Sequence, residues 1–194
     1  DSITFSITIL KMNFSKFNLA VVIPAYRTEK EILAVLQGIP TFIRHIIVVD
    51  DASPDSSADL VTAAAKKNRR ILLVRHTKNQ GVGGAMVTGF KKALELGAEI
   101  VIKLDGDGQM DPQYIPALIT PLITGEADYA KGNRFRDFDA LRQMPIVRRI
   151  GNLGLSFLTK AATGYWNIFD PTNGYFAIRA EMLAQLPLDR IDKG

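Results

Sequence analysis

One stretch of the chain decides the predicted fold: Val101-Ile-Lys-Leu-Asp105-Gly-Asp107-Gly-Gln109-Met-Asp111-Pro112. It is an apolar run that ends in two carboxylates, Asp105 and Asp107, separated by a glycine. In a strand, residues two apart point to the same face, and glycine allows a tight bend and close approach by a ligand. The pattern predicts a buried strand followed either by a ligand-binding turn or by an Asp/Gly-rich surface turn.

The paired carboxylates favour a cation site. Like charges repel each other, so clustered carboxylates need a compensating charge. A divalent cation is the usual one, and hard oxygen ligands suit Mg²⁺ or Mn²⁺. Gln109 adds a neutral oxygen at the next i+2 step. Such a cation typically bridges protein carboxylates to a substrate phosphate, so a phosphate-bearing ligand is the expected partner.

Composition excludes several other classes of protein. The 194 residues are 47% apolar and 23% charged, which predicts a globular domain with a real core. There is no cysteine, which excludes disulfides and thiolate chemistry, and only two histidines, which argues against a His-based metal site. A net charge of +4 without a long basic run argues against nucleic-acid binding. No apolar run is long enough for a membrane span, and a cytoplasmic location fits.

The N-terminal residues are expected to lie outside the catalytic domain. Residues 1–11 lack the basic region of a signal peptide, and Met12 follows them, so we expect them to be of vector or upstream origin. The predicted division is an N-terminal tail over residues 1–18 and a catalytic domain over residues 19–194.

The rest of the chain alternates short apolar runs with helix-like segments. Val- and Ile-rich runs that are apolar at nearly every position predict strands buried on both faces. They lie at Leu19–Ile23, His45–Val49, Ile71–Val74 and Ile100–Leu104, with later strands at Asp128–Gly132 and Gly174–Ile178. Helices are predicted at Glu29–Gln37, Ser53–Lys67, Ala85–Leu96, from Asp111, at Arg148–Ala162 and at Ala180–Gln185. This order predicts an α/β fold, a doubly wound, mostly parallel sheet flanked by helices.

Unusual residues follow each predicted strand, where open α/β sheets bind ligands. Asp50 and Asp51 follow the second strand and could accept hydrogen bonds from a nucleobase or ribose, or could simply favour a helix start. Gly81-Val-Gly83-Gly84 opens a helix, so its N–H groups could face an anion, although a structural tight turn explains it equally well. It matches neither the dinucleotide fingerprint nor the P-loop.

Two later features have comparable alternatives. Arg142, Arg148 and Arg149 could form a solvated helix face or could hold a second phosphate beside a metal–diphosphate site. The segment from Asp170 to Phe176 could be a Pro/Asn/Gly turn or could bring Asp170 near an acceptor.

Together these motifs resemble the family 2 glycosyltransferases with the GT-A fold, and most of all their polyprenyl-phosphate (dolichol-phosphate mannose synthase-like) branch. The resemblance covers Leu19 to Leu186. The order and spacing of the matching motifs support the resemblance more strongly than any single motif does. The matching stretches are Val22–Tyr26 with Glu29, Val48–Asp55, Asn79–Ala85, Asp105–Gln109 with Asp111-Pro112, Gly132–Phe135, Arg148–Asn152 and Asp170–Phe176.

The resemblance implies a role for each matching position. Nucleotide-binding roles fall on Pro24, Tyr26, Glu29, Asp50, Asp51, Gly81, Gly83 and Arg134. Catalytic roles fall on Asp105, Asp107, Asp170, Arg148 and Arg149. Metal ligation of Mg²⁺ or Mn²⁺ falls on Asp105, Asp107 and Gln109. Two departures leave the sugar and the acceptor open: Arg27 replaces a frequent Asn, and Pro171-Thr172-Asn173 replaces a Thr-Ser-like pair.

The expected activity is a metal-dependent, inverting transfer of a sugar from GDP-mannose or a UDP-hexose to a polyprenyl phosphate at the inner face of the membrane. A hydroxyl acceptor of a cell-surface polysaccharide is the alternative. A sugar-phosphate nucleotidyltransferase and a non-catalytic nucleotide-binding module are weaker alternatives. Relatives often continue into C-terminal membrane helices, so the chain is expected to be a truncated catalytic domain. Its oligomeric state is left open.

Overall fold

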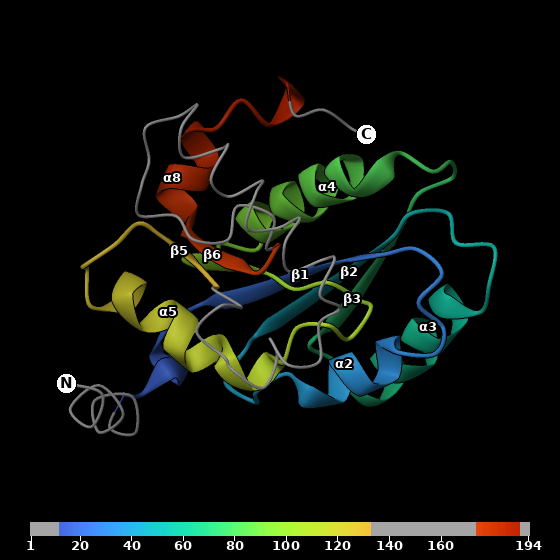
Figure 1. Cartoon of the computed structure of the whole chain (residues 1–194), viewed down its shortest axis with the longest axis horizontal. Coiled ribbons are helices and arrows are strands. Elements are labelled where there is room, and N and C mark those ends of the chain that lie inside the picture. The colour runs from blue at the N-terminus through green and yellow to red at the C-terminus, as the bar shows by residue number, and fades with distance from the viewer. Residues whose placement is uncertain (1–11, 133–173, 191–194) are drawn as a thin grey trace, which may run out of the picture. The chain divides into compact units, whose positions relative to one another are not determined.

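The computed structural model describes residues 12–132 and 174–190 of the chain, and its helices and strands are shown in Figure 1. Its contacts divide the chain into two compact units, Asp1–Ala130 with Tyr175–Gly194, and Lys131–Gly174. The second unit contributes only residues 131, 132 and 174 to the described part. The predicted site residues that the structure describes all belong to the first unit.

The described strands form one six-stranded sheet in the order β3-β2-β1-β4-β6-β5. The strands are β1 (Leu19–Ala25), β2 (His45–Asp50), β3 (Ile71–Arg75), β4 (Ile100–Lys103), β5 (Tyr129–Lys131) and β6 (Phe176–Arg179). Strands β1 to β4 are parallel to one another, whereas β6 is antiparallel to β4. The predicted doubly wound, mostly parallel α/β sheet is confirmed.

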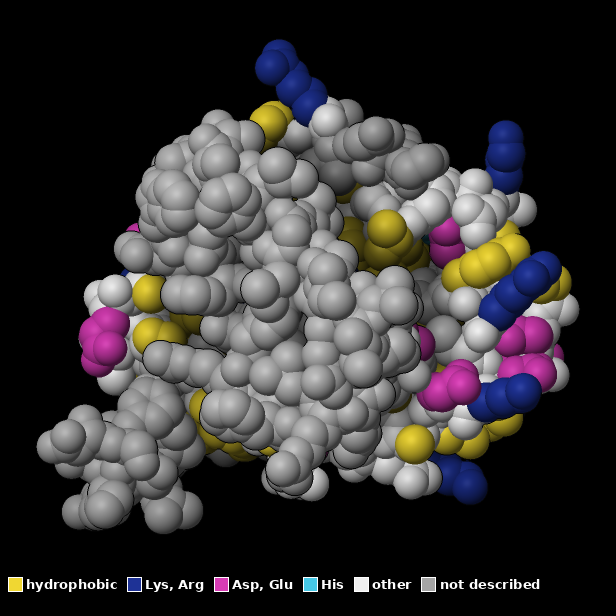
Figure 2. Space-filling model, in the orientation of Figure 1, with side chains coloured by type: hydrophobic (Ala, Val, Ile, Leu, Met, Phe, Trp, Pro, Cys, Tyr) yellow, Lys and Arg dark blue, Asp and Glu magenta, His cyan; other side chains and the backbone are white. Residues whose placement is uncertain are grey.

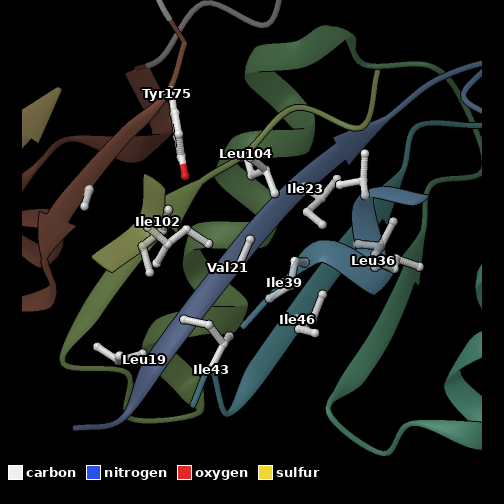
Figure 3. Packing of buried hydrophobic residues seen from close by; sticks show 14 of the residues in the cluster. Leu19, Val21, Ile23, Leu36, Ile39, Ile43, Ile46, Ile102, Leu104 and Tyr175 are labelled. Atoms are coloured by element: carbon white, nitrogen blue, oxygen red, sulfur yellow. The ribbon is translucent and has the colours of Figure 1, made fainter. Parts of the chain in front are cut away.

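Helices cover both faces of this sheet (Figure 1). They are α2 (Ile32–Gly38), α3 (Ser57–Lys67), α4 (Gly81–Glu95), α5 (Ile115–Ile123) and α8 (Ala180–Gln185), with 3₁₀ turns η1 (Phe14–Lys16), η2 (Pro112–Tyr114) and η4 (Leu188–Arg190). Alternate residues of β1 face opposite sides. Leu19, Val21 and Ile23 belong to a buried cluster that includes residues of α2, α3 and α5, and Figure 3 shows them with Leu36 of α2. Ala20 and Val22 belong to a second cluster with residues of α4 and α8. None of the described helices has the length and apolar character needed to cross a bilayer.

The starts of α3 and α4 differ from the sequence prediction by four residues each, and α2, predicted from Glu29, begins three residues later at Ile32. Helix α3 begins at Ser57 rather than Ser53, because Ala52 adopts a left-handed backbone (φ 57°) and Ser53 Oγ accepts a hydrogen bond from the Arg27 N–H. Ser53, which was expected to cap the helix, instead connects the loop after β2 to the loop after β1. Helix α4 begins at Gly81 rather than Ala85, so the glycine-rich loop forms the first turn of the helix.

Gly89 allows α4 to lie close against the sheet. A Cβ atom there would lie 2.2 Å from Val22 Cγ1 and 3.3 Å from Val49 Cγ2. Gly89→Ala should gain about 1 kcal/mol of helix propensity and lose about 1–3 kcal/mol through overpacking. We expect a net decrease in the free energy of unfolding, measured by urea denaturation. Val22→Ala removes the nearer methyl group, so the double variant should lose less than the sum of the two single variants, and strict additivity would contradict the contact.

Candidate functional site

The carboxyl ends of β1 and β4 mark the point where the strand order reverses. From β1 the chain moves outward through β2 to β3, and then returns to place β4 on the other side of β1. In open α/β sheets, ligands bind in the crevice at such a switch point. The Asp105–Asp107 turn follows β4, and a Cβ on Gly106 would lie 3.2 Å from the Pro24 carbonyl oxygen at the end of β1. The structure thus brings the predicted metal turn and the predicted nucleotide segment together.

Asp105 pairs with a lysine that the sequence analysis did not single out. Lys103 is the last residue of β4 and is buried, and its Nζ lies 2.6 Å from Asp105 Oδ1. A buried ammonium is unfavourable without a charge partner, so this pair fixes both side chains at the edge of the sheet. The sequence did contain a signal for this pair, because Lys103 is a charged residue inside an otherwise apolar run.

Asp107 and Gln109 are exposed at the tip of the same turn. Asp107 Oδ1 accepts a hydrogen bond from the Gln109 N–H at 3.1 Å, and Gly108 supplies the positive φ (75°) of the bend. Within the described ranges, no three His, Asp or Glu side chains gather closely enough to hold a metal. Two carboxylates and an amide oxygen nevertheless fit Mg²⁺ or Mn²⁺, because such ions often bind one or two carboxylates and complete their shell with substrate phosphates and water.

Asp50, at the end of β2, is a buried carboxylate whose side chain makes no hydrogen bond with the described part of the chain. It is 1% exposed, and neither of its oxygens accepts a hydrogen bond from a described residue. The nearest opposite charge is Arg75 Nε at 3.7 Å, on a side chain that is largely exposed. Burying a carboxylate in this way is costly. An unsatisfied acceptor at the ligand-binding edge is therefore suited to a ligand N–H or O–H group.

Asp51 has the opposite environment. Both of its oxygens accept the Gln80 N–H, at 2.9 and 3.1 Å, and Oδ1 also lies 2.7 Å from Nδ1 of His76. Its own N–H donates to the Ala25 carbonyl oxygen. Two adjacent aspartates that the sequence could not distinguish thus differ: Asp51 is tied to the start of α4, whereas Asp50 is not.

The loops after β1 and β2 are held together by reciprocal hydrogen bonds. Glu29 Oε2 accepts the Ser56 N–H, Asp55 accepts the N–H groups of Glu29 and Ser57, and Ser57 Oγ accepts the Thr28 N–H. Burial alone would raise the pKa of Asp55, but the hydrogen bonds from Ser57 and Glu29 outweigh it and hold this pKa below its usual value. Glu29, predicted to line the nucleotide pocket, therefore also supports the loop beside that pocket.

A shallow cavity of about 440 Å³ lies over these loops. Figure 2 shows acidic and basic side chains intermixed on the described surface near α2 and α3. The cavity is lined by Arg27, Glu29, Lys30, Glu31, Pro54 and Asp55. None of the predicted metal ligands lines it, and of the predicted nucleotide-binding residues only Glu29 does, so this cavity is not the predicted metal site.

Of the remaining predicted residues, Tyr26, Gly81 and Gly83 lie in the described part of the chain, and the others do not. Tyr26 is 45% exposed with the Arg27 guanidinium 5.3 Å from its ring centre, and Arg27 has a strained positive φ (56°). Gly81 and Gly83 lie in the first turn of α4, where the Gly81 N–H donates to Asn79 Oδ1. The predictions for Arg134, Arg142, Arg148, Arg149 and Asp170 fall outside the described residues.

A comparison with protein families matches residues 20–186 to the model described as "Glycosyl transferase family 2". The chain belongs to this family. It is a glycosyltransferase, and the resemblance drawn from its motifs is confirmed. This family 2 chain has the GT-A fold, since its strand order and its structural neighbours agree.

Several curated family members are similar over most of the chain. A UDP-N-acetylglucosamine–dolichyl-phosphate N-acetylglucosaminyltransferase from Methanococcus voltae is 35% identical over 85% of this chain and 70% of its own length. An undecaprenyl-phosphate mannosyltransferase from Micrococcus luteus is 32% identical over 76% of this chain and 59% of its own length. Among solved structures, glucosyl-3-phosphoglycerate synthase from Mycobacterium tuberculosis is 21% identical with a TM-score of 0.69, covering 92% of this chain and 62% of that one.

Proposed function

We propose that this family 2 chain transfers a sugar, with inversion and in a metal-dependent manner, from a nucleoside diphosphate sugar to a polyprenyl phosphate. The observation that carries the proposal is the position of the Asp105–Asp107 turn at the switch point, in contact with the end of β1. A GDP-mannose or UDP-hexose donor would lie across the carboxyl ends of β1, β2 and β4. The acceptor would approach from the side of the sugar.

The donor's nucleoside would bind to groups that the fold leaves available. Asp50 offers two buried, unsatisfied oxygens to base N–H or ribose O–H groups, and the exposed Tyr26 ring offers a stacking surface. Asp51, with Pro24 and Glu29, would form the adjoining wall of the pocket. Gly81 and Gly83 begin a 15-residue helix, whose N-terminus favours an anion.

The diphosphate would bind at the turn after β4. A cation held by Asp107 and Gln109, with Asp105, would neutralise the charge that develops on the leaving diphosphate. Lys103 holds Asp105 in place at 2.6 Å, which pre-organises this carboxylate beside the sugar. The similarly folded synthase was solved with Mn²⁺ and UDP-glucose, which agrees with this assignment.

The acceptor is proposed from the relatives, whose names specify dolichyl and undecaprenyl phosphates. A phosphate monoester has a second pKa near 6 and is mostly dianionic at pH 7, so it attacks without a strong general base. Arg134, Arg148 and Arg149 would position it. A lipid acceptor would place the reaction at the inner, cytoplasmic surface of the membrane. None of the described helices could itself span that membrane.

The variant Asp170→Asn separates the two acceptor classes. With a phosphate acceptor, a general base is unnecessary, and we expect less than about a tenfold loss of kcat/KM. With a polysaccharide hydroxyl, Asp170 would serve as the base, and the loss should reach about 10²–10⁴-fold. Initial rates with a polyprenyl phosphate and with an oligosaccharide acceptor, each compared with the unsubstituted chain, measure the difference.

Two alternatives make different predictions. A sugar-phosphate nucleotidyltransferase would need a Gly-rich, basic loop after β1, where this chain has Pro24-Ala25-Tyr26-Arg27. A non-catalytic binding module would bind its nucleotide without a cation. Thermal stability with UDP or GDP, each with and without Mn²⁺, tests all three. A Mn²⁺-dependent increase for one diphosphate supports the proposal and identifies the base; no increase with either diphosphate, from folded protein, rejects it.

A further inference from the structure

His76 is a buried imidazole that no step of the proposed reaction uses. It follows β3 and is 7% exposed in its side chain. Its Nδ1 lies 2.7 Å from Asp51 Oδ1, and its Nε2 lies 2.9 Å from the Thr88 hydroxyl on α4. The ring therefore connects the end of β2 to the middle of the helix that covers this face of the sheet.

The donors and acceptors of this chain of contacts can be assigned. An ionised carboxylate only accepts hydrogen bonds, so Nδ1 carries the proton and donates to Asp51. With the proton on Nδ1, Nε2 is the acceptor for the Thr88 O–H, and the Nδ1–Asp51 hydrogen bond fixes this tautomer. Asp51 also accepts the Gln80 N–H on both oxygens. The carboxylate is thus held in one orientation from the β3 side and from the start of α4.

We propose that His76 is a positioning residue that sets the affinity for the nucleoside diphosphate by orienting Asp51. The inference rests on the proposed function, in which Asp51 forms part of the nucleotide pocket. Among the described residues, Oδ1 is in contact with both His76 and Gln80, whereas Oδ2 accepts only the longer of the two Gln80 contacts. Oδ2 therefore keeps an acceptor direction for an N–H or O–H group of the nucleotide. Without His76, the carboxylate could rotate and lose this pre-organised direction.

Two substitutions of His76 separate its two contacts. In His76→Asn the amide nitrogen can take the place of Nδ1 and donate to Asp51, whereas in His76→Gln it reaches toward the place of Nε2 and Thr88. We expect His76→Gln to weaken UDP or GDP binding, measured by calorimetry with Mn²⁺, about tenfold or more, and His76→Asn to weaken it less than about threefold.

Steady-state kinetics provide a readout that a merely structural role would not produce. For His76→Gln, the donor KM should rise about tenfold while kcat stays within about twofold, because the ring orients a binding group and does not touch the reacting atoms. The pair Thr88→Val and Thr88→Ser is the second test, with weaker binding expected only for the valine variant. If a His76 variant does not fold, the two Thr88 variants still test the positioning role of His76.

The outcomes distinguish this inference from the proposed function. If the unsubstituted chain binds neither UDP nor GDP, the proposed function fails. If it binds and the Asn and Gln variants bind equally well, the positioning role is wrong and the proposed function stands. Equal loss of affinity in both variants, accompanied by a lower melting temperature, would also overturn the inference in favour of a general structural role.

Discussion

Replacing Asp107 with alanine should abolish the cation-dependent part of nucleotide binding and leave the fold intact. At a diphosphate concentration about 100 times its Kd, ligand binding stabilises a protein by about 2.7 kcal/mol. In Asp107→Ala this increment should disappear when Mn²⁺ is present. The activity kcat/KM should fall by about 100-fold or more, because Lewis-acid stabilisation of a leaving group is worth several kcal/mol.

The local structure explains why the stability without ligand should not change. Asp107 is exposed, and the interaction described for its side chain is the hydrogen bond that Oδ1 accepts from the Gln109 N–H. Surface substitutions of this kind usually change the free energy of unfolding by no more than about 0.5 kcal/mol. The effect on Mn²⁺-dependent binding should therefore be separable from any effect on folding.

Glu126→Ala is a suitable control for Asp107→Ala. Glu126 is also exposed and also carries one negative charge, but it lies after α5 and away from the carboxyl ends of β1 and β4. It should keep the Mn²⁺-dependent stabilisation. Persistence of that stabilisation in Asp107→Ala would mean that the cation binds elsewhere. Mn²⁺ alone should stabilise neither protein strongly, since the described turn lacks a third carboxylate and needs the diphosphate to complete the site.

The strands and their order could be predicted because they depend on local patterns. Runs such as Leu19–Ile23 are apolar at every position, which requires burial on both faces, and the right-handed crossover rule then limits the topology. The same rule places the strand ends, and with them Asp50 and Asp105, at one edge. All five residues after residue 132 with predicted catalytic or phosphate-binding roles lie outside the described ranges, so the structure does not test them: Arg134, Arg142, Arg148, Arg149 and Asp170.

The hydrogen-bond partners within the site could not be predicted in the same way. His76 contacts Asp51, 25 residues earlier, and Thr88, 12 residues later, and neither spacing follows from strand or helix periodicity. These contacts depend on how closely α4 approaches the sheet, which Gly89 permits. The late start of α3 could not be predicted either. It follows from the left-handed backbone at Ala52, a conformation that an alanine in the sequence does not indicate.

The two adjacent aspartates at the end of β2, Asp50 and Asp51, should respond in opposite ways to the same substitution. Asp50→Asn is expected to raise the free energy of unfolding of the nucleotide-free protein by about 1 kcal/mol, because a buried charge without hydrogen bonds is replaced by a neutral amide. The lost pairing with the exposed Arg75 offsets this by at most about 1 kcal/mol. Asp51→Asn should instead lower the free energy of unfolding by about 1.5–3 kcal/mol, because the hydrogen bonds from His76 and Gln80 lose their charged acceptor and one acceptor oxygen becomes an NH2 donor.

The gain in stability at Asp50 should come with a loss of function. If its buried oxygens serve to accept ligand N–H or O–H groups, Asp50→Asn should bind UDP or GDP about tenfold more weakly or worse, since one oxygen becomes a donor that faces the ligand's own donors. Urea denaturation without nucleotide and calorimetry with it measure the two effects on the same sample. A destabilised Asp50→Asn with unchanged nucleotide affinity would contradict the assignment, and would mean that the Arg75 pair, rather than a ligand, is the reason for a carboxylate at the end of β2.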